Sequence, residues 1–176
     1  MMSRTMTDAQ IPKRVDGVKL IDNNQQLSGQ IDTKRLARLS AAIVRSDAPV
    51  TCNLSFERDA ERHKVLTGQC STHVVMTCQR CLGEVPLDVE SEFQLALVFN
   101  DDQAKQLPKR FEPAELDEDG LMDLWEIIED EVLLSLPDFP MHPVGECTAH
   151  MPEQNETNAD AKRPNPFDVL AQLKQK

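Results

Sequence analysis

The sequence predicts an α+β domain, in which a small meandering antiparallel sheet is packed with an amphipathic helix and a tethered C-terminal helix follows. Three runs between residues 50 and 100 have the apolar alternation or the Val and Thr content of strands. A later run, residues 121–136, repeats its apolar side chains with the period of a helix. A chain of 176 residues, 40% of them hydrophobic, can bury a core of its own, so one domain is expected.

The segment before the sheet contains one expected helix. Residues 1–20 lack a clear period and are expected to form a loose lead-in. In SGQIDTKRLARLSAAIVRSDAP, apolar side chains recur at helical spacing after Asp32, a capping residue type, and Pro49 follows. The pattern predicts a helix at about residues 32–45.

Three strand-like runs come next. PVTCNLSFER alternates apolar and polar residues, which is the period of a half-buried strand and places Cys52 facing inward. HKVLTGQCSTHVVMTC is rich in Val and Thr, places Cys70 inward, and contains Gly68, which indicates a bulge. EVPLDVESEFQLALVFN presents one apolar face that only Ser91 interrupts. Because short turns join the runs, a meandering antiparallel sheet is the economical topology.

The second half of the chain is helix, loop and tail. DGLMDLWEIIEDEVLLSLP has an apolar stripe at helical spacing and ends at Pro137. The following stretch is rich in Pro and Asn, so residues 152–164 are expected to be a flexible linker. NPFDVLAQLKQK begins with a capping residue and a proline and predicts a short helix over residues 165–176. The single α+β domain is therefore expected to span residues 21–151.

The charge is distributed unevenly along the chain. Of the net charge of −11, residues 1–110 contribute 15 basic minus 14 acidic residues, or +1, while residues 111–161 contribute −15 and residues 162–176 contribute +3. An acidic surface repels phosphate, so a protein that grips RNA or DNA over a broad face is disfavoured. A basic protein partner is favoured, with Glu126, Glu129 and Asp130 on the outer side of the acidic helix as candidate partner-binding residues. The alternative is that these acids only solvate a helix and a loop.

Four residues have the types and spacing of a metal site. Cys78 and Cys81 form a C-x-x-C pair on a turn between two strands, and His142 and Cys147 follow the acidic helix. Structural zinc takes four Cys or His ligands supplied as two short clusters, so this set predicts a zinc site if the later loop folds back onto the hairpin. Two alternatives stay open: a thiol-redox pair, which is normally found at a helix N-terminus, and cysteines that are merely small turn residues.

Other classes of function have little support in the sequence. There is no glycine-rich phosphate loop, nucleophile elbow or zinc hydrolase pattern, so no enzyme and no small-molecule substrate are expected. No run of apolar residues has the length of a signal peptide or a membrane span, which predicts a cytoplasmic protein without a membrane partner. Five cysteines in a reducing compartment are not expected to form a disulfide framework.

Three motifs together resemble the bacterial YceD family. They are CQRCLGEV, LWEIIEDEVLLSLPDFPMHPVGEC and RPNPFDVLAQLKQK, in this order, and the resemblance covers roughly residues 12–176. In other branches of the family the segment after the acidic helix is rich in cysteine, whereas this sequence has His142 and Cys147 there.

The resemblance implies a role in the synthesis, processing or accumulation of the large-subunit (23S) ribosomal RNA, without an established enzymatic activity. A net charge of −11 opposes RNA binding, because the protein and the RNA phosphates are both negatively charged. We therefore expect an adaptor whose partner is a basic ribosomal protein or an rRNA-processing enzyme, with indirect contact to rRNA. A weak direct RNA-binding protein is the alternative, and a thiol-redox protein is the third.

Overall fold

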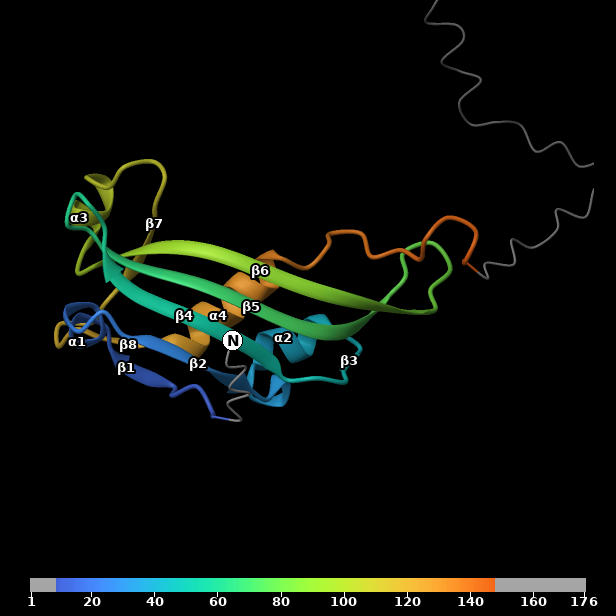
Figure 1. Cartoon of the computed structure of the whole chain (residues 1–176). Helices are drawn as coiled ribbons and strands as arrows, with labels where there is room; N and C mark the ends of the chain where they lie inside the picture. The colour runs from blue at the N-terminus through green and yellow to red at the C-terminus, as the bar shows by residue number, and fades with distance from the viewer. Residues whose placement is uncertain (1–8, 148–176) are drawn as a thin grey trace, which may run out of the picture.

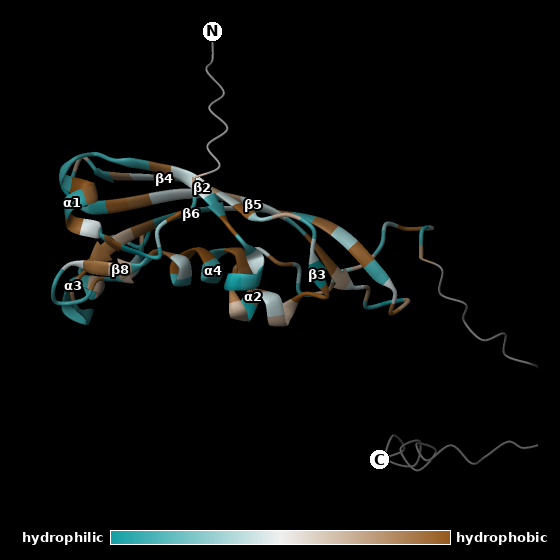
Figure 2. Ribbon diagram, turned by 90° about the horizontal axis from the view of Figure 1, so that it is seen from below, coloured by the Kyte–Doolittle hydropathy of each residue, from teal (hydrophilic) through white to brown (hydrophobic). Residues whose placement is uncertain are grey.

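The structure is a computed structural model, and it describes residues 9–147 of the chain. A long, twisted sheet forms its backbone, and helices and a small two-stranded ribbon cover one face of that sheet (Figures 1 and 2). The other face is largely open. This mixture of sheet and helix confirms the predicted α+β class. In the described residues no helix is long and apolar enough to cross a membrane.

The large sheet has the strand order β2-β4-β5-β6-β7, and β3 pairs with β5 off this path. Its strands are β2 (Gln26–Ile31), β3 (Arg45–Ser46), β4 (Val50–Arg58), β5 (Lys64–Thr77), β6 (Glu84–Val98) and β7 (Glu112–Glu115). The neighbours β4, β5 and β6 are joined by short turns and pair antiparallel, as predicted. The strand β7 pairs with β6 in parallel, so the sheet is mixed and not the purely antiparallel meander that we expected. A parallel neighbour needs a crossover, which here runs through α3 (Asp101–Lys105) and residues 106–111.

The alternation predicted along the strands is the inward-outward alternation of the sheet. In β4 the residues Val50, Cys52, Leu54 and Phe56 are buried, and the residues between them face outward. The buried Ser91 of β6 donates a hydrogen bond from its hydroxyl to the carbonyl oxygen of Glu131 (3.1 Å). The polar interruption of this apolar face therefore has a partner on the covering helix.

Gly68 does not mark a bulge. It pairs in register with Leu54 on one side and Phe93 on the other. A Cβ atom at this position would lie 2.1 Å from the ring of Phe93, so the glycine leaves room for that ring in the core.

The helix that we expected over residues 121–136 is shorter. The helix α4 spans Leu124–Leu134, and the three preceding residues form β8 (Leu121–Asp123), which pairs antiparallel with β1 (Arg14–Asp16). The side chain of Asp123 accepts from the backbone N–H groups of Trp125 and Glu126 and begins the helix. Leu124, Ile128 and Val132 of α4 are completely or almost completely buried against the sheet.

The helix predicted over residues 32–45 is broken into two. Asp32 caps a short 3-10 helix (Thr33–Arg35), the chain turns at Leu36, and α2 (Ala37–Ala42) follows. Residues after α2 are extended and lead into β3. The predicted apolar face is correct, because Leu36 and Leu39 are buried in the core.

The predicted N-terminal boundary is wrong. Residues 14–22 form β1 and α1 (Gly17–Asp22), and Ile11, Val15 and Ile21 belong to the main core. Such short elements carry no recognisable period, and only pairing with β8 and packing on the sheet order them. The linker expected at residues 152–164 and the helix expected at 165–176 lie outside the described residues.

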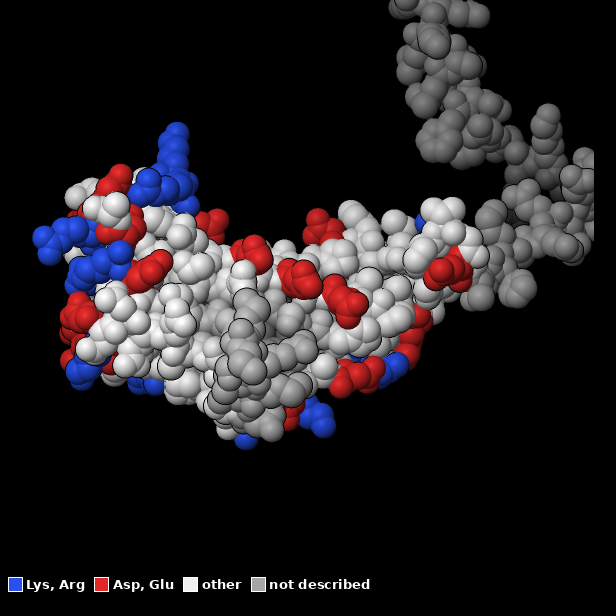
Figure 3. Space-filling model, in the orientation of Figure 1, with Lys and Arg blue, Asp and Glu red and all other residues white. Residues whose placement is uncertain are grey.

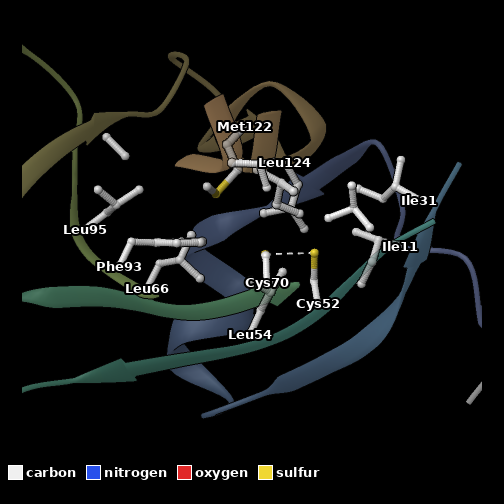
Figure 4. Close-up of a cluster of buried hydrophobic side chains, with 14 of the residues drawn as sticks. Ile11, Ile31, Cys52, Leu54, Leu66, Cys70, Phe93, Leu95, Met122 and Leu124 are labelled. Atoms are coloured by element: carbon white, nitrogen blue, oxygen red, sulfur yellow. Dashed lines mark hydrogen bonds between the residues drawn. The ribbon is translucent and has the colours of Figure 1, made fainter. Parts of the chain in front are cut away.

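The core lies between the inner face of the sheet and α4, α2 and α1. Figure 4 shows side chains from β4, β5 and β6 meeting those of the segment around Met122 and Leu124. Cys52 and Cys70 lie opposite each other on β4 and β5, inside this core, as their inward-facing positions predicted. A second, smaller cluster of Val65, Ala96 and Phe111 lies on the opposite face, under residues 107–111.

Candidate metal centre and acidic groove

The C-x-x-C pair lies on the turn between β5 and β6. The backbone N–H of Cys78 donates to the carbonyl oxygen of Gly83 (2.8 Å), and the N–H of Leu82 donates to the carbonyl oxygen of Cys78 (2.9 Å). Leu82 has a φ of 60°, which lets the chain reverse within six residues. The turn directs both thiols to the same side. Cys78 is completely buried and Cys81 is partly buried.

The loop after α4 folds back onto this turn. The N–H of Gln79 donates to the carbonyl oxygen of Pro140 (2.8 Å), so the loop and the hairpin lie side by side at one end of the sheet (Figure 1). This is the fold-back that the zinc prediction required. It brings His142 and Cys147 to Cys78 and Cys81 across about sixty residues of sequence.

The four ligand atoms lie within 4.8 Å of one another. The Sγ atoms of Cys78 and Cys147 are 3.6 Å apart, and Nδ1 of His142 lies 3.4 Å from Sγ of Cys81 and 3.8 Å from Sγ of Cys147. Around a tetrahedral zinc ion, ligand atoms with Zn–S of about 2.3 Å and Zn–N of about 2.0–2.1 Å are about 3.5–3.8 Å apart. The donor set and its spacing therefore fit zinc.

His142 is oriented by a hydrogen bond on its other nitrogen. Its Nε2 lies 2.9 Å from the carbonyl oxygen of Glu84, which can only accept, so Nε2 carries the proton. The lone pair is then on Nδ1, which faces the thiols. This backbone partner fixes the tautomer in the way that outer-sphere partners do at known metal sites.

The thiols are not equivalent in acidity. Burial opposes ionisation of Cys78, but backbone N–H groups of Cys81, His142 and Arg80 point at its sulfur and lower its pKa to about 5. Burial and the neighbouring sulfurs of Cys81 and Cys78 raise the pKa of Cys147 to about 11. A cation would remove the repulsion between the sulfurs, because it allows all three cysteines to bind as thiolates.

The redox alternative finds little support in this geometry. The pair lies on a hairpin turn and not at a helix N-terminus, where a redox-active C-x-x-C is normally found. Cys52 and Cys70 are 0% and 4% exposed, and hydrogen bonding to Cys70 together with burial raises the pKa of Cys52. A buried thiol with a raised pKa, such as that of Cys52, is a poor nucleophile.

The three acidic candidates on α4 have different surroundings. Glu126 is exposed, and Asp130 is half-buried and pairs with the guanidinium of Arg38. Glu129 is only 8% exposed, and its carboxylate accepts hydrogen bonds from Arg38 and Leu39. We expected Glu129 on the outer side of the helix, and this is wrong, because α2 packs over that part of α4.

A groove of about 310 Å³ runs between β7 and α4 and is lined by acidic side chains. Among the described residues, no Lys or Arg lines it. Its carboxylates belong to Glu112, Glu115, Asp123, Glu126, Asp130 and Glu131. Burial, with Glu112 and Asp130 nearby, raises the pKa of Glu131. The residues Glu112 and Glu115 were missed by the sequence analysis, because the four-residue strand that carries them has no period of its own.

A second group of possible metal ligands lies at the opposite end of the sheet. Asp59, Glu61 and His63 on the β4–β5 turn bring their ligand atoms together. Arg110 approaches both carboxylates (3.0 and 3.1 Å), and His63 Nδ1 lies 3.0 Å from Asp59. With a guanidinium in place, this group is a satisfied ion-pair network and not a cation site.

The architecture and the four-ligand cluster define the class of protein. It is a small α+β protein in which the β5–β6 hairpin and the loop after α4 share one Cys/His cluster. The chain belongs to the YceD family, described as large ribosomal RNA subunit accumulation protein YceD, which matches residues 66–174. It is similar to the large ribosomal RNA subunit accumulation protein YceD of Haemophilus influenzae, with 39% identity over 97% of this chain and 100% of that protein. These findings confirm the family that the three motifs predicted. No solved structure matches the chain.

Proposed function

We propose that this protein is a ribosome-biogenesis factor required for the synthesis, processing or accumulation of large-subunit rRNA, and that it acts in the cytoplasm as a non-enzymatic adaptor. The observation that carries this role is the family membership, because the family and the similar protein are both named for accumulation of large ribosomal RNA subunit. The adaptor mechanism goes further and has its support in the surface of the molecule.

The acidic groove supports a basic protein as the partner. Among the described residues, Glu112, Glu115, Glu126 and Glu131 line the groove and make no ion pair. Carboxylates gathered on one surface speed the association of a positively charged partner and exclude negatively charged ones. Proteins that bind RNA, which include ribosomal proteins and rRNA-processing enzymes, carry the basic surfaces that this groove would attract. At this surface, the protein would affect rRNA metabolism by binding a basic protein partner.

Zinc has a structural part in this proposal. Cys78, Cys81, His142 and Cys147 would fill all four positions of a tetrahedral shell, and a filled shell is typical of structural sites. The ion would join the β5–β6 hairpin to the loop after α4. This link would hold the hairpin and the loop together at an end of the molecule where the described residues form no large hydrophobic core.

Depletion of the protein tests the role directly. Cells without it should have a lower ratio of large-subunit to small-subunit rRNA, and a plasmid copy should restore the ratio. An unchanged ratio would overturn the role. Purified protein should contain about one zinc per chain, and a metal-free preparation that folds and functions normally would remove zinc from the proposal.

The partner surface is tested with a groove variant, Glu112→Lys, Glu115→Lys and Glu126→Lys, which leaves Glu129 in place. The matched control reverses the exposed Glu57, Glu90 and Glu118, which make no ion pair among the described residues. Both variants change the net charge by the same amount. In affinity capture at two salt concentrations, the groove variant should recover fewer basic proteins than wild type. The control variant should recover as many as wild type. Equal recovery from both variants would contradict the proposed surface.

A further inference from the structure

An open pocket of about 300 Å³ lies at the end of the molecule opposite the metal centre. It is formed by the β4–β5 turn, the end of β6, and α3 with the residues after it. Its charged lining residues are Arg62 and Lys64, and His63 lies between them. No carboxylate from residues 9–147 lines it, although the chain carries a net charge of −11.

The cations around this pocket are not neutralised by nearby acids. Arg62 and Lys64 line the pocket, and Lys109 follows the lining residue Leu107 by two positions in the chain. None of the three makes an ion pair with a described residue. The Nζ atom of Lys64 lies 4.6 Å from the centre of the Phe99 ring. The nearest acidic residues along the turn, Asp59 and Glu61, are held by Arg110 and His63. Positive charge is therefore free to meet an anion here.

The basic character extends beyond the pocket. Figure 3 shows most of the visible Lys and Arg side chains gathered at the end that carries α3 and the β4–β5 turn. Asp and Glu predominate along the rest of that face. The segment from α3 onward adds Lys109, whereas Lys105 pairs with Asp102 and Arg110 pairs with Asp59 and Glu61. A polyanion that reaches the pocket would meet a further cation at its rim.

The remaining lining suits a nucleotide more than a bare anion. Gln103 accepts the backbone N–H of Phe99 with its Oε1 (2.9 Å), so its amide NH₂ group remains a donor. Gln106 adds a second amide. Leu107 is partly exposed and supplies apolar surface, while Ala96 and Val98 are almost completely buried at the floor of the pocket. Cations and amides can bind phosphate and sugar, and the aliphatic side chain of Leu107 can lie against a base without aromatic stacking.

We propose that this pocket binds a phosphate and its adjoining nucleotide in single-stranded RNA, with Arg62, Lys64 and Lys109 as the phosphate-binding residues. The inference deepens the proposed function and rests on it, because the role in rRNA accumulation is what makes RNA the relevant polyanion. It adds a direct RNA contact at one end of the adaptor to the protein contact at the acidic groove. Three cations make this contact weak and local.

The test uses the full chain, purified with its metal, and a fluorescent 12-nucleotide single-stranded RNA of mixed sequence. The pocket variant is Arg62→Gln, Lys64→Gln and Lys109→Gln. The control variant, Lys13→Gln, Lys34→Gln and Arg35→Gln, removes the same charge from exposed positions elsewhere. Anisotropy is recorded from 50 to 200 mM salt. Circular dichroism and thermal melting establish that both variants are folded.

The wild type should bind with a plot of log K against log salt whose slope is about −0.7, the value for one neutralised phosphate in a single strand. The pocket variant should lose about tenfold or more in affinity at 50 mM salt, and its slope should approach zero. The control variant should change less than about twofold. Equal effects from both variants would overturn the site, and so would a pocket that binds inorganic phosphate but not the RNA.

Depletion in cells, compared with RNA binding by the pocket variant, distinguishes a failure of the RNA site from a failure of the proposed function. If depletion lowers large-subunit rRNA but the pocket variant binds RNA normally, the role stands and the site is wrong. If RNA binding depends on the pocket but depletion leaves rRNA unchanged, the site stands and the role is wrong.

Discussion

The carboxylate of Glu129, in the middle of α4, caps the first turn of α2 by accepting the backbone N–H of Arg38 at 2.7 Å. The same oxygen accepts the N–H of Leu39 at 3.0 Å. Leu36, the N-cap residue of α2, has an apolar side chain that cannot accept hydrogen bonds from these donors. A residue about ninety positions away therefore does the work of a helix cap.

Replacing Glu129 should destabilise the fold. Glu129→Ala leaves two helix N–H groups without an acceptor, and we expect the free energy of unfolding to fall by about 2–4 kcal/mol. Glu129→Gln keeps one acceptor oxygen and should cost less. Urea denaturation measures both. The exposed neighbour Glu126→Ala is the control and should change stability by less than about 0.5 kcal/mol; equal effects at the two positions would contradict the capping role.

Removing the metal should free the loop after α4 but leave the sheet folded. With free zinc at 100 to 1,000 times its dissociation constant, binding adds about 3–4 kcal/mol to the free energy of unfolding, and a chelator removes it. Cys78→Ser should abolish one-to-one zinc binding, while Gln79→Ala on the same turn should retain it. Metal analysis and hydrogen exchange of residues 137–147 measure these changes. Normal exchange protection in Cys78→Ser would show that zinc does not hold the loop.

Gly68 and Phe93 should behave as a coupled pair. Gly68→Ala places a methyl group where the Phe93 ring lies, and we expect a loss of about 1–3 kcal/mol. Phe93→Leu removes part of the ring and makes room. In the double variant the cost of alanine should therefore be smaller by at least about 0.5 kcal/mol. Strictly additive losses in a double-mutant cycle would show that the ring does not set the need for glycine.

Asp59 should make stability depend on pH in the acidic range. Although burial opposes its ionisation, hydrogen bonds from His63 and Arg110 lower its pKa from 3.8 to about 2. Because the pKa is lower in the folded protein, the ionised carboxylate stabilises the fold at pH values above its ordinary pKa. This stabilisation disappears as the pH falls from about 4 to about 2. The gap in unfolding free energy between wild type and Asp59→Asn should narrow over this range. Glu90→Gln, at an exposed position without an ion pair, should run parallel to wild type.

The sequence by itself determined the parts of the fold that have a long period. The nine residues of β4, the fifteen of β6 and the buried stripe of α4 repeat often enough for the pattern to identify the element and its inner face. The run that forms β5 is less regular, and its Val and Thr content identified it as a strand. The ligand set of the metal centre was also visible, because Cys and His are few in this chain and their chemistry is specific. The periods are local, so neighbouring residues contain the information. The convergence of the two ligand pairs is not local, because it depends on the loop after α4 folding back onto the β5–β6 turn.

The tertiary structure decided what depends on distant partners. Pairing with β8 orders residues 14–16, a crossover places β7 parallel to β6, and α2 covers Glu129. The strands β1 and β7 have no pattern of their own, because each is too short to form without the surface against which it packs. The segment of α2 has helical spacing, but nothing in it shows that it covers Glu129. The pocket cations are likewise an outcome of folding. Arg62 and Lys64 meet the segment around Lys109 only because the β4–β5 turn lies beside the crossover, and nothing in the linear charge pattern separates them from the acids next to them.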